Sequence, residues 1–314
     1  MISQNFIFKG KGNLEIFTYK WLPNEHEEVK GVVQIAHGMA ETAARYENFA
    51  STLTKDGFIV YANDHRGHGK TVGQVERLGD LGEDSFNSMV EDMHSLNKII
   101  KEENPNLPVF LFGHSMGSFL SQRYVCLYSG ELNGAIITGT CGARGIILDI
   151  GLLIVKTEIK KVGRNGRSDK LGKLIFGGYD RAFKPCRTAY DWLSSDNKEV
   201  DKYINDPFCG SSFTAGFFCD FLSGLKSAEN DTEIKNISID LPIYIFAGDK
   251  DPVGKNGKGV LKLVKTYRKH GIKDLVYKFY KGGRHEMLNE INKEEVIEDV
   301  IKWLNAHKNK YIGI

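Results

Sequence analysis

The chain has 314 residues, of which 41% are hydrophobic and 26% are charged. This length fits one large α/β domain with an insertion, and the composition is that of a globular protein with a substantial core. Because 42 Lys and Arg nearly balance 40 Asp and Glu, the formal net charge of +2 excludes a global attraction to nucleic acid or to a membrane.

Cysteine content and the N-terminal segment indicate the compartment. The five cysteines are an odd number and form no C-x-x-C pair, a pattern typical of free thiols in a reducing compartment. The N-terminal segment MISQNFIFKGKGN lacks a basic stretch followed by an apolar run, so we expect no secretory signal. The most apolar stretch, residues 145–156, contains Asp149 and is shorter than the about 20 residues that span a bilayer. We therefore expect a soluble, cytoplasmic protein.

Strand-like and helix-like segments alternate in the N-terminal half. Two segments, around Phe6–Phe8 and Glu15–Trp21, are expected to form antiparallel edge strands. Apolar runs typical of buried strands follow at residues 32–36, 58–62, 109–112 and 135–138. Apolar residues recur at helical spacing from Ser85 to Lys101, with Asp84 or Ser85 available as N-cap. This alternation predicts a mostly parallel central sheet with helices on both faces.

The regular alternation stops between residues 141 and 225. This region contains the polar stretch KKVGRNGRSDKLGK and then the aromatic-rich segments FGGYDRAF, AYDWL and SSFTAGFFCDFL. These features indicate helices and irregular structure without a second independent domain. We therefore predict a core made of residues 1–140 and 226–314, with a mainly helical cap at residues 141–225.

Strands and helices return in the C-terminal part. Residues 242–247 and 275–280 are predicted strands, and a final amphipathic helix is predicted from Lys293 to Ala306. A further helix, near Gly257 to His270, has lysines on one side and apolar residues on the other. A solvated surface helix explains that pattern better than a surface for anionic lipid, although both remain open.

The segment VFLFGHSMGSFL contains the order G-x-S-x-G where a buried strand passes into a helix. Such a turn holds its central residue, Ser115, in a strained conformation that exposes the hydroxyl. Gly113 and Gly117 leave room for the turn because they have no Cβ atom. The N–H of Met116 begins the new helix and points to where an oxyanion would develop. A tight turn with an incidental serine is the alternative, and the strand-to-helix context favours a nucleophile.

A serine hydroxyl becomes nucleophilic when a base removes its proton and a carboxylate orients that base. Of the nine histidines, His285 follows the last predicted strand, at the edge where open α/β sheets have their sites. The segment FAGDKDP after the preceding strand offers Asp249 and Asp251, and either could simply form a turn. The chain order of serine, aspartate and histidine is that of an α/β-hydrolase.

A second oxyanion donor is expected from the loop after an early strand. The segment His37–Glu41 follows the strand at residues 32–36, and its Gly38 allows the backbone to bend toward the serine. We therefore predict an oxyanion hole made by the N–H groups of Met39 and Met116. A glycine-containing connection without this role is the alternative.

Two histidines on a glycine-rich loop, His65 and His68, raise the question of a metal site. They are three residues apart, and no cysteine or carboxylate cluster of ligand spacing lies nearby in the sequence. A structural role near the site loops is therefore the better interpretation. No phosphate-binding glycine motif occurs either, so we expect neither a metal nor a nucleotide cofactor.

Several segments together resemble the monoacylglycerol lipase and lysophospholipase-like α/β-hydrolases, which are also grouped with serine aminopeptidase-like sequences. These segments are HGMAETAARY, NDHRGHGKT, GHSMG, GDKDPV and GGRHEMLNE. The resemblance runs from about Glu15 to Trp303, and RTAYDWLSSDNKEVDKYINDPFCG looks like the cap of bacterial lysophospholipase-type members. Thr71 stands where relatives commonly have serine, and we expect little consequence because a hydroxyl is retained.

The resemblance implies a role for each candidate residue of the site. It assigns the nucleophile to Ser115, the base to His285, the acid to Asp251 with Asp249 as the fallback, and the oxyanion donors to Met39 and Met116. It also implies the α/β-hydrolase fold.

The substrate implied by the resemblance is a lipid carboxylic ester, monoacylglycerol or lysophospholipid, cleaved through an acyl-enzyme. The alternatives are an aminopeptidase, amidase or general carboxylesterase on the same scaffold, and a non-enzymatic ligand receptor. Cap aromatics and the apolar run Ile146–Val155 line an acyl pocket or a rim that touches a membrane transiently, or else they form the cap's own core. No nucleic acid partner is expected.

Overall fold

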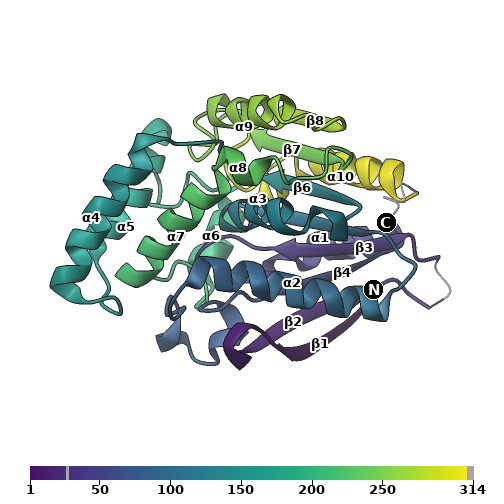
Figure 1. Ribbon diagram of the computed structural model, residues 1–314, viewed down its shortest axis with the longest axis horizontal. Coiled ribbons are helices and arrows are strands. Elements are labelled where there is room, and N and C mark those ends of the chain that lie inside the picture. Colours follow the sequence, from purple (N-terminus) through teal and green to yellow (C-terminus); the bar gives the residue numbers. More distant parts are fainter. Residues whose placement is uncertain (26–27, 310–314) are drawn as a thin grey trace.

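The computed structural model describes residues 1–25 and 28–309, and an eight-stranded sheet forms its centre (Figure 1). The strands are β1 (Ile2–Lys9), β2 (Glu15–Leu22), β3 (Gly31–Ala36), β4 (Phe58–Asn63), β5 (Val109–His114), β6 (Gly134–Thr138), β7 (Ile243–Gly248) and β8 (Leu275–Tyr280). Their order in the sheet is β1-β2-β4-β3-β5-β6-β7-β8. Strand β2 is antiparallel to both of its neighbours, and all other adjacent strands are parallel. The predicted fold class, a mostly parallel sheet with flanking helices, is confirmed.

Helices cover both faces of the sheet because alternate side chains of each strand point to opposite faces. On one face, α1 (Glu47–Lys55) and α10 (Lys293–His307) contribute to one apolar cluster. On the other face, α2 (Ser85–Glu103), α3 (Met116–Tyr128) and α9 (Lys258–Lys269) contribute to a second. Helix α9 buries its apolar side against the sheet and leaves its lysines exposed, as a surface helix does.

Helix α2 begins at the predicted residue, but its cap comes from a distant part of the chain. Asp84 occupies the N-cap position and its side chain makes no cap hydrogen bond. The carboxylate of Asp220 instead accepts from the N–H and the hydroxyl of Ser85, at 3.0 and 3.2 Å. Arg164 donates to the same carboxylate at 2.9 Å. The first turn of α2 is therefore fixed by residues between β6 and β7.

The chain leaves the sheet between β6 and β7 and forms most of its remaining helices there. These are α4 (Ile146–Val162), α5 (Asp169–Phe176), α6 (Asn197–Asn205), α7 (Ala215–Ala228) and α8 (Asp231–Ile234). Helix α7 contacts α4 as well as α2 and α3. In Figure 1, α4 and α5 lie at the end of the molecule opposite the two termini. No helix in the two described ranges combines the length and apolar character needed to cross a bilayer.

Candidate active site

Ser115 lies at the turn between β5 and α3, with φ 52° and ψ −119°. Residues with a side chain rarely adopt this conformation. The turn is closely packed, since a Cβ atom on Gly117 would lie 2.0 Å from the carbonyl oxygen of Ala36 in β3. On the other side, the N–H of Ser115 donates to the carbonyl of Thr138 in β6 at 3.0 Å. Neighbouring strands therefore hold the strained serine in place.

His285 and Asp251 lie in line with Ser115, each on a loop that follows a different strand. The distance from Ser115 Oγ to His285 Nε2 is 2.9 Å, and that from His285 Nδ1 to Asp251 Oδ1 is 3.0 Å. With a proton on Nδ1 donated to the carboxylate, Nε2 is free to accept from the serine hydroxyl. His285 and Asp251 are both buried. The structure thus brings three of the predicted residues together.

The other carboxylate that the sequence left open, Asp249, has a different environment. Its Oδ1 accepts from the N–H of Gly282 at 2.8 Å and so stabilises the turn beside β8. Asp251 is the aspartate that contacts His285, and its Oδ1 also accepts from the N–H of Val253 at 2.9 Å. The second oxygen of Asp251 is buried, and no described residue hydrogen-bonds to it.

The protonated form of His285 is favoured by nearby negative charge. Burial alone would lower the pKa of His285, but the charge and hydrogen bond of Asp251 outweigh it, and Glu286 and Glu41 act in the same direction. The pKa of His285 is therefore raised above its ordinary value. This environment suits an imidazole that must take up a proton during a reaction.

Two methionines lie near Ser115. Met39 is on the loop after β3, and Met116 is the first residue of α3. Within the described chain, neither backbone N–H has a protein acceptor. The loop approaches the serine closely, since a Cβ atom on Gly38 would lie 3.1 Å from Ser115 Cβ. Gly38 donates its own N–H to Glu41 Oε1 at 2.6 Å, and this hydrogen bond fixes the loop. Both predicted donors are therefore placed near the serine with their hydrogen-bonding capacity unused.

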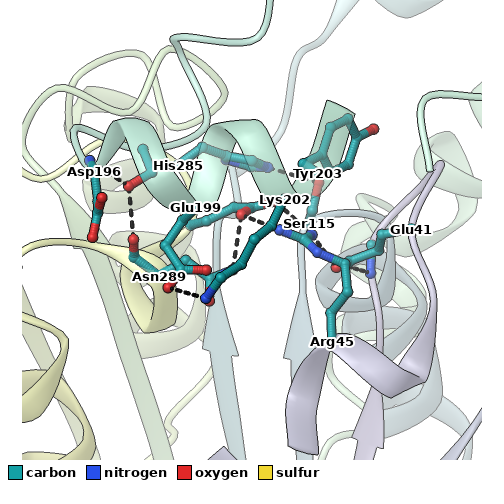
Figure 2. Close-up of polar contacts among 12 residues, drawn as sticks. Glu41, Arg45, Ser115, Asp196, Glu199, Lys202, Tyr203, His285 and Asn289 are labelled. Atoms are coloured by element: carbon teal, nitrogen blue, oxygen red, sulfur yellow. Dashed lines mark hydrogen bonds and ion pairs between the residues drawn. The ribbon is translucent and has the colours of Figure 1, made fainter. Parts of the chain in front are cut away.

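A buried group of one cation and two carboxylates, which the sequence analysis missed, braces this loop. Figure 2 shows Arg45 beside Glu41. Arg45 donates to Glu41 Oε2 at 2.6 Å and to both carboxylate oxygens of Glu286 at 2.8 and 2.7 Å. Glu41 and Glu286 occur in segments that carry the resemblance, but the sequence separation of 241 between Arg45 and Glu286 hides the contact. The group joins the loop of Met39 to the loop of His285.

The two carboxylates of this group have opposite pKa shifts. Burial raises the pKa of Glu41, and the charge of Glu286 adds to the effect, whereas Arg45 opposes it. Burial acts in the same sense on Glu286, but the paired hydrogen bonds and charge of Arg45 outweigh it and lower the pKa of Glu286 to about 2. Glu286 therefore carries the negative charge that balances Arg45.

Two cavities meet at Ser115, and Met39 and Trp192 line both of them. The polar arm has a volume of about 360 Å³ and is lined by Lys173, Asp180, Tyr190, Tyr203 and Ser211, among others. The apolar arm has a volume of about 290 Å³ and is lined by Phe119, Ile147, Leu148, Ile150, Ile154 and Phe221, among others. A third cavity of about 460 Å³ lies between α1 and α10, and Ser115 does not line it. Both arms present more apolar than polar surface, and the polar arm is distinguished by the polar side chains named above, which the apolar arm lacks.

His65 and His68 lie in a buried group of histidine rings with His37. The N–H of His65 donates to His37 Nε2 at 2.9 Å, which ties the loop after β4 to the loop after β3. Burial, together with the charges of His68 and Arg66, lowers the pKa of His65 to about 3. Burial also lowers the pKa of His68 to about 4. Across residues 1–25 and 28–309, no three His, Cys, Asp or Glu side chains are grouped to hold a metal ion.

The hydroxyl of Thr71 is used by the fold. It donates to the carbonyl of Asp64 at 2.7 Å and accepts from the N–H of Phe17 at 3.0 Å. The threonine therefore links β2 to the loop after β4 through an oxygen that a serine would also supply.

The sheet, the strained serine at its carboxyl edge and the aligned histidine and aspartate define an α/β-hydrolase. The chain belongs to the serine aminopeptidase S33 family, whose model matches residues 27–292.

Two relatives are similar over most of their length. The chain is 30% identical to a monoacylglycerol lipase of Mycolicibacterium smegmatis, with 96% of each chain covered. It is 25% identical to the monoglyceride lipase of Mus musculus, covering 92% of this chain and 86% of the mouse protein.

Among solved structures, a thermostable carboxyl esterase from Bacillus coagulans in complex with glycerol is similar throughout. Its TM-score is 0.90 at 30% identity, with 98% of this chain and 99% of the esterase covered.

The close packing at Gly117 yields a stability prediction. We expect Gly117→Ala to lower the free energy of unfolding by about 1–3 kcal/mol, because the added methyl group meets the backbone of β3. Gly130→Ala is the control, since no atom lies within 4 Å of its added Cβ. Urea unfolding of both variants measures the difference. A Gly117→Ala variant as stable as Gly130→Ala would contradict this account of the turn.

Proposed function

We propose that this chain is a serine hydrolase that cleaves lipid carboxylic esters, monoacylglycerol or lysophospholipid, through an acyl-enzyme. The observation that carries the proposal is the alignment of Ser115, His285 and Asp251 at 2.9 and 3.0 Å, beside an arm lined by apolar side chains. The names of the relatives, monoacylglycerol lipase and carboxyl esterase, support an ester substrate.

The proposed reaction is acyl transfer in two halves. Ser115 Oγ attacks the ester carbonyl while its proton passes to His285 Nε2, and Asp251 stabilises the imidazolium. The N–H groups of Met39 and Met116 donate to the oxyanion of the tetrahedral intermediate. This intermediate collapses as His285 gives its proton to the departing alcohol. Water then attacks the acyl-enzyme, loses a proton to His285 and releases the carboxylic acid, and the proton returns to Ser115.

We assign the two parts of the ester by the side chains that line the two arms. The apolar arm suits the acyl chain, because burying each CH₂ group contributes about 0.8 kcal/mol. The polar arm suits the alcohol, since the hydroxyl of Ser211 is buried there without a partner among the described residues. Most of the residues that complete the arms belong to the cap, which we propose comprises residues 141–225.

The assignment of the acid yields a paired prediction. We expect Asp251→Asn to lower kcat by about 10⁴, because the histidine loses the group that fixes its tautomer. Asp249→Asn is the matched control and should leave kcat within a few-fold of wild type, because the Asp249 side chain hydrogen-bonds to Gly282 of the turn and, among the described residues, not to His285. Steady-state hydrolysis of a soluble ester measures both. A larger loss for Asp249→Asn would reverse the assignment.

The same variant should also change the pH dependence. The neutral form of His285 is the active base, so kcat/KM rises as pH increases through the pKa of His285. Asp251 raises this pKa. In Asp251→Asn the pKa of His285 should therefore fall, and the rise of the residual kcat/KM with pH should occur at lower pH than in wild type. A limb that moved to higher pH would contradict the proposed electrostatics.

The apolar arm yields a prediction on chain length. We expect kcat/KM to be higher for long-chain monoacylglycerols than for short-chain esters, with Ser115→Ala as the blank. A panel that includes lysophospholipids and aminoacyl amides also tests the alternatives. Preference for aminoacyl amides would indicate an aminopeptidase, and labelling by a fluorophosphonate without steady turnover would indicate a receptor. Faster hydrolysis of short esters would refute the lipid assignment.

We also propose that the cap touches a lipid surface through one face of α4. Ile146, Ile147, Ile150 and Leu153 follow helical spacing and are 73, 59, 54 and 68% exposed. Lysines are exposed toward the end of the same helix, at positions 156, 160 and 161. Ile147 and Ile150 also line the apolar arm. A lipid in contact with this face would therefore lie at the entrance to the acyl site.

This contact can be tested by sedimentation with mixed phosphatidylcholine and phosphatidylglycerol vesicles. We expect Ile146→Glu combined with Leu153→Glu to reduce vesicle binding at least several-fold, since charge on the apolar face opposes insertion. Neither residue lines either arm, so hydrolysis of a soluble ester should be unchanged. Ile291→Glu is the control, because Ile291 is 70% exposed away from α4. Equal vesicle binding by wild type and the double variant would overturn the proposal.

A further inference from the structure

The segment Asp191–Asp196, in the insertion between β6 and β7, is hydrogen-bonded to the loop that carries His285. The N–H of Glu286 donates to the carbonyl of Leu193 at 2.7 Å. The hydroxyl of Ser194 donates to the carbonyl of Asn289 at 2.7 Å. Two segments more than 90 residues apart therefore form one unit beside the catalytic base.

Glu290 is the centre of this unit. Its side chain is 1% exposed, and it accepts from the N–H of Arg284 at 2.8 Å and from the N–H of Ser195 at 3.1 Å. The hydroxyl of Ser195 also donates to it. No lysine, arginine or histidine of the described chain forms an ion pair with Glu290. A buried carboxylate that meets only N–H and O–H donors from two segments is well suited to hold those segments together.

Arg284 holds the same segment from its other end. Its guanidinium donates to the carbonyls of Asp191 and Ser194, the second at 3.1 Å. The group also lies over the ring of Phe183, with Cζ 4.3 Å from the ring centroid. Trp192 lies between the two carbonyls along the chain, so its backbone is fixed on both sides.

The side chain placed by these contacts is the indole of Trp192. Its ring centroid is 5.0 Å from that of His285 and 4.9 Å from that of Tyr179. Trp192 is 8% exposed. Like Met39 and Ser115, it lines both arms. The indole therefore lies where the polar and apolar arms meet, against the face of the base.

We propose that Trp192 is the wall between the two arms and a determinant of alcohol selectivity, and that Glu290 and Arg284 are positioning residues that act through it. The inference rests on the proposed ester hydrolysis. A fixed indole confines the acyl chain to the apolar arm and leaves the polar arm to the alcohol. Without the indole, the opening between the arms beside Ser115 widens and an ester can bind in either direction, so discrimination between alcohols weakens.

The test is a selectivity ratio, kcat/KM for a long-chain monoacylglycerol divided by kcat/KM for the methyl ester of the same fatty acid. We expect Trp192→Ala to move this ratio toward one by about tenfold or more, and Trp192→Phe to retain most of it. Glu290→Gln should move the ratio in the same direction. The amide N–H₂ of glutamine cannot accept the hydrogen bonds that the carboxylate accepts from the N–H groups of Arg284 and Ser195, so the segment of Trp192 is held less firmly. Glu298→Gln is the control, an exposed residue of α10 that pairs with Lys302.

A purely structural role for Glu290 makes a different prediction. If Glu290→Gln lowered kcat/KM equally for both esters, or lowered only the melting temperature, the positioning role would be refuted. Should Glu290→Gln not fold, Arg284→Met removes the contacts to Asp191 and Ser194 and must shift the ratio in the same direction. An unchanged ratio in Trp192→Ala would refute the wall itself. A wild-type protein that hydrolyses neither ester would instead refute the proposed function.

Discussion

The close approach of α3 to the end of β3 is the constraint on which the site depends. Because Gly117 has no side chain, the first turn of the helix lies against the carbonyl of Ala36, where a Cβ atom would be only 2.0 Å away. That contact leaves Ser115 at φ 52° and brings the loop after β3 beside it. Ser115 and the two unused N–H groups of Met39 and Met116 then occupy one small region. A wider turn would separate them, whatever residues stood at these positions.

Near His285, the guanidinium of Arg45 pairs with carboxylates on two loops, the loop after β3 and the loop of His285. Burying an ion pair is costly in free energy unless further hydrogen bonds satisfy both partners. Arg45 meets this condition, because it contacts Glu41 and Glu286, and these accept in turn from Gly38 and Asn289. The same carboxylates favour a positive charge on His285. One group of side chains thus shapes the loop of Met39 and adds to the larger effect of Asp251 in raising the pKa of His285.

The sequence predicted the parts of the fold that local patterns specify. Strands β3 to β7 are buried along their whole length, so they appear as continuous apolar runs with ends within one or two residues of those observed. The serine turn was recognisable for the same reason, because strand, glycine, serine and helix follow one another. The local pattern did not separate Asp249 from Asp251, since both suit a turn. The resemblance favoured Asp251, and this is the aspartate that the folded chain buries beside His285.

Contacts between distant segments account for what the sequence did not predict. The N-terminus of α2 is capped by Asp220, 135 residues away, whereas the local sequence offered only Asp84 or Ser85 as N-cap. Arg45, Glu290 and Trp192 lie in segments that carry the resemblance, but the sequence does not indicate their roles. Each is placed by partners far along the chain. The side chains of the apolar run 146–155 lie in different environments, which the sequence offered as alternatives for the whole run. Leu148 and Val155 are buried, whereas Leu153 is exposed.

The insertion between β6 and β7 is attached to the rest of the molecule in two different ways. Its segment around Trp192 is hydrogen-bonded to the loop of His285, and α7 packs on α2 and α3. Helix α4 instead packs mainly on α7, and none of the described residues that hydrogen-bond to His285 belongs to α4 or α5. The apolar arm is therefore lined in large part by helices that do not position the base. Changes in α4 and α5 can alter the shape of that arm while the distances between Ser115, His285 and Asp251 are kept by the sheet.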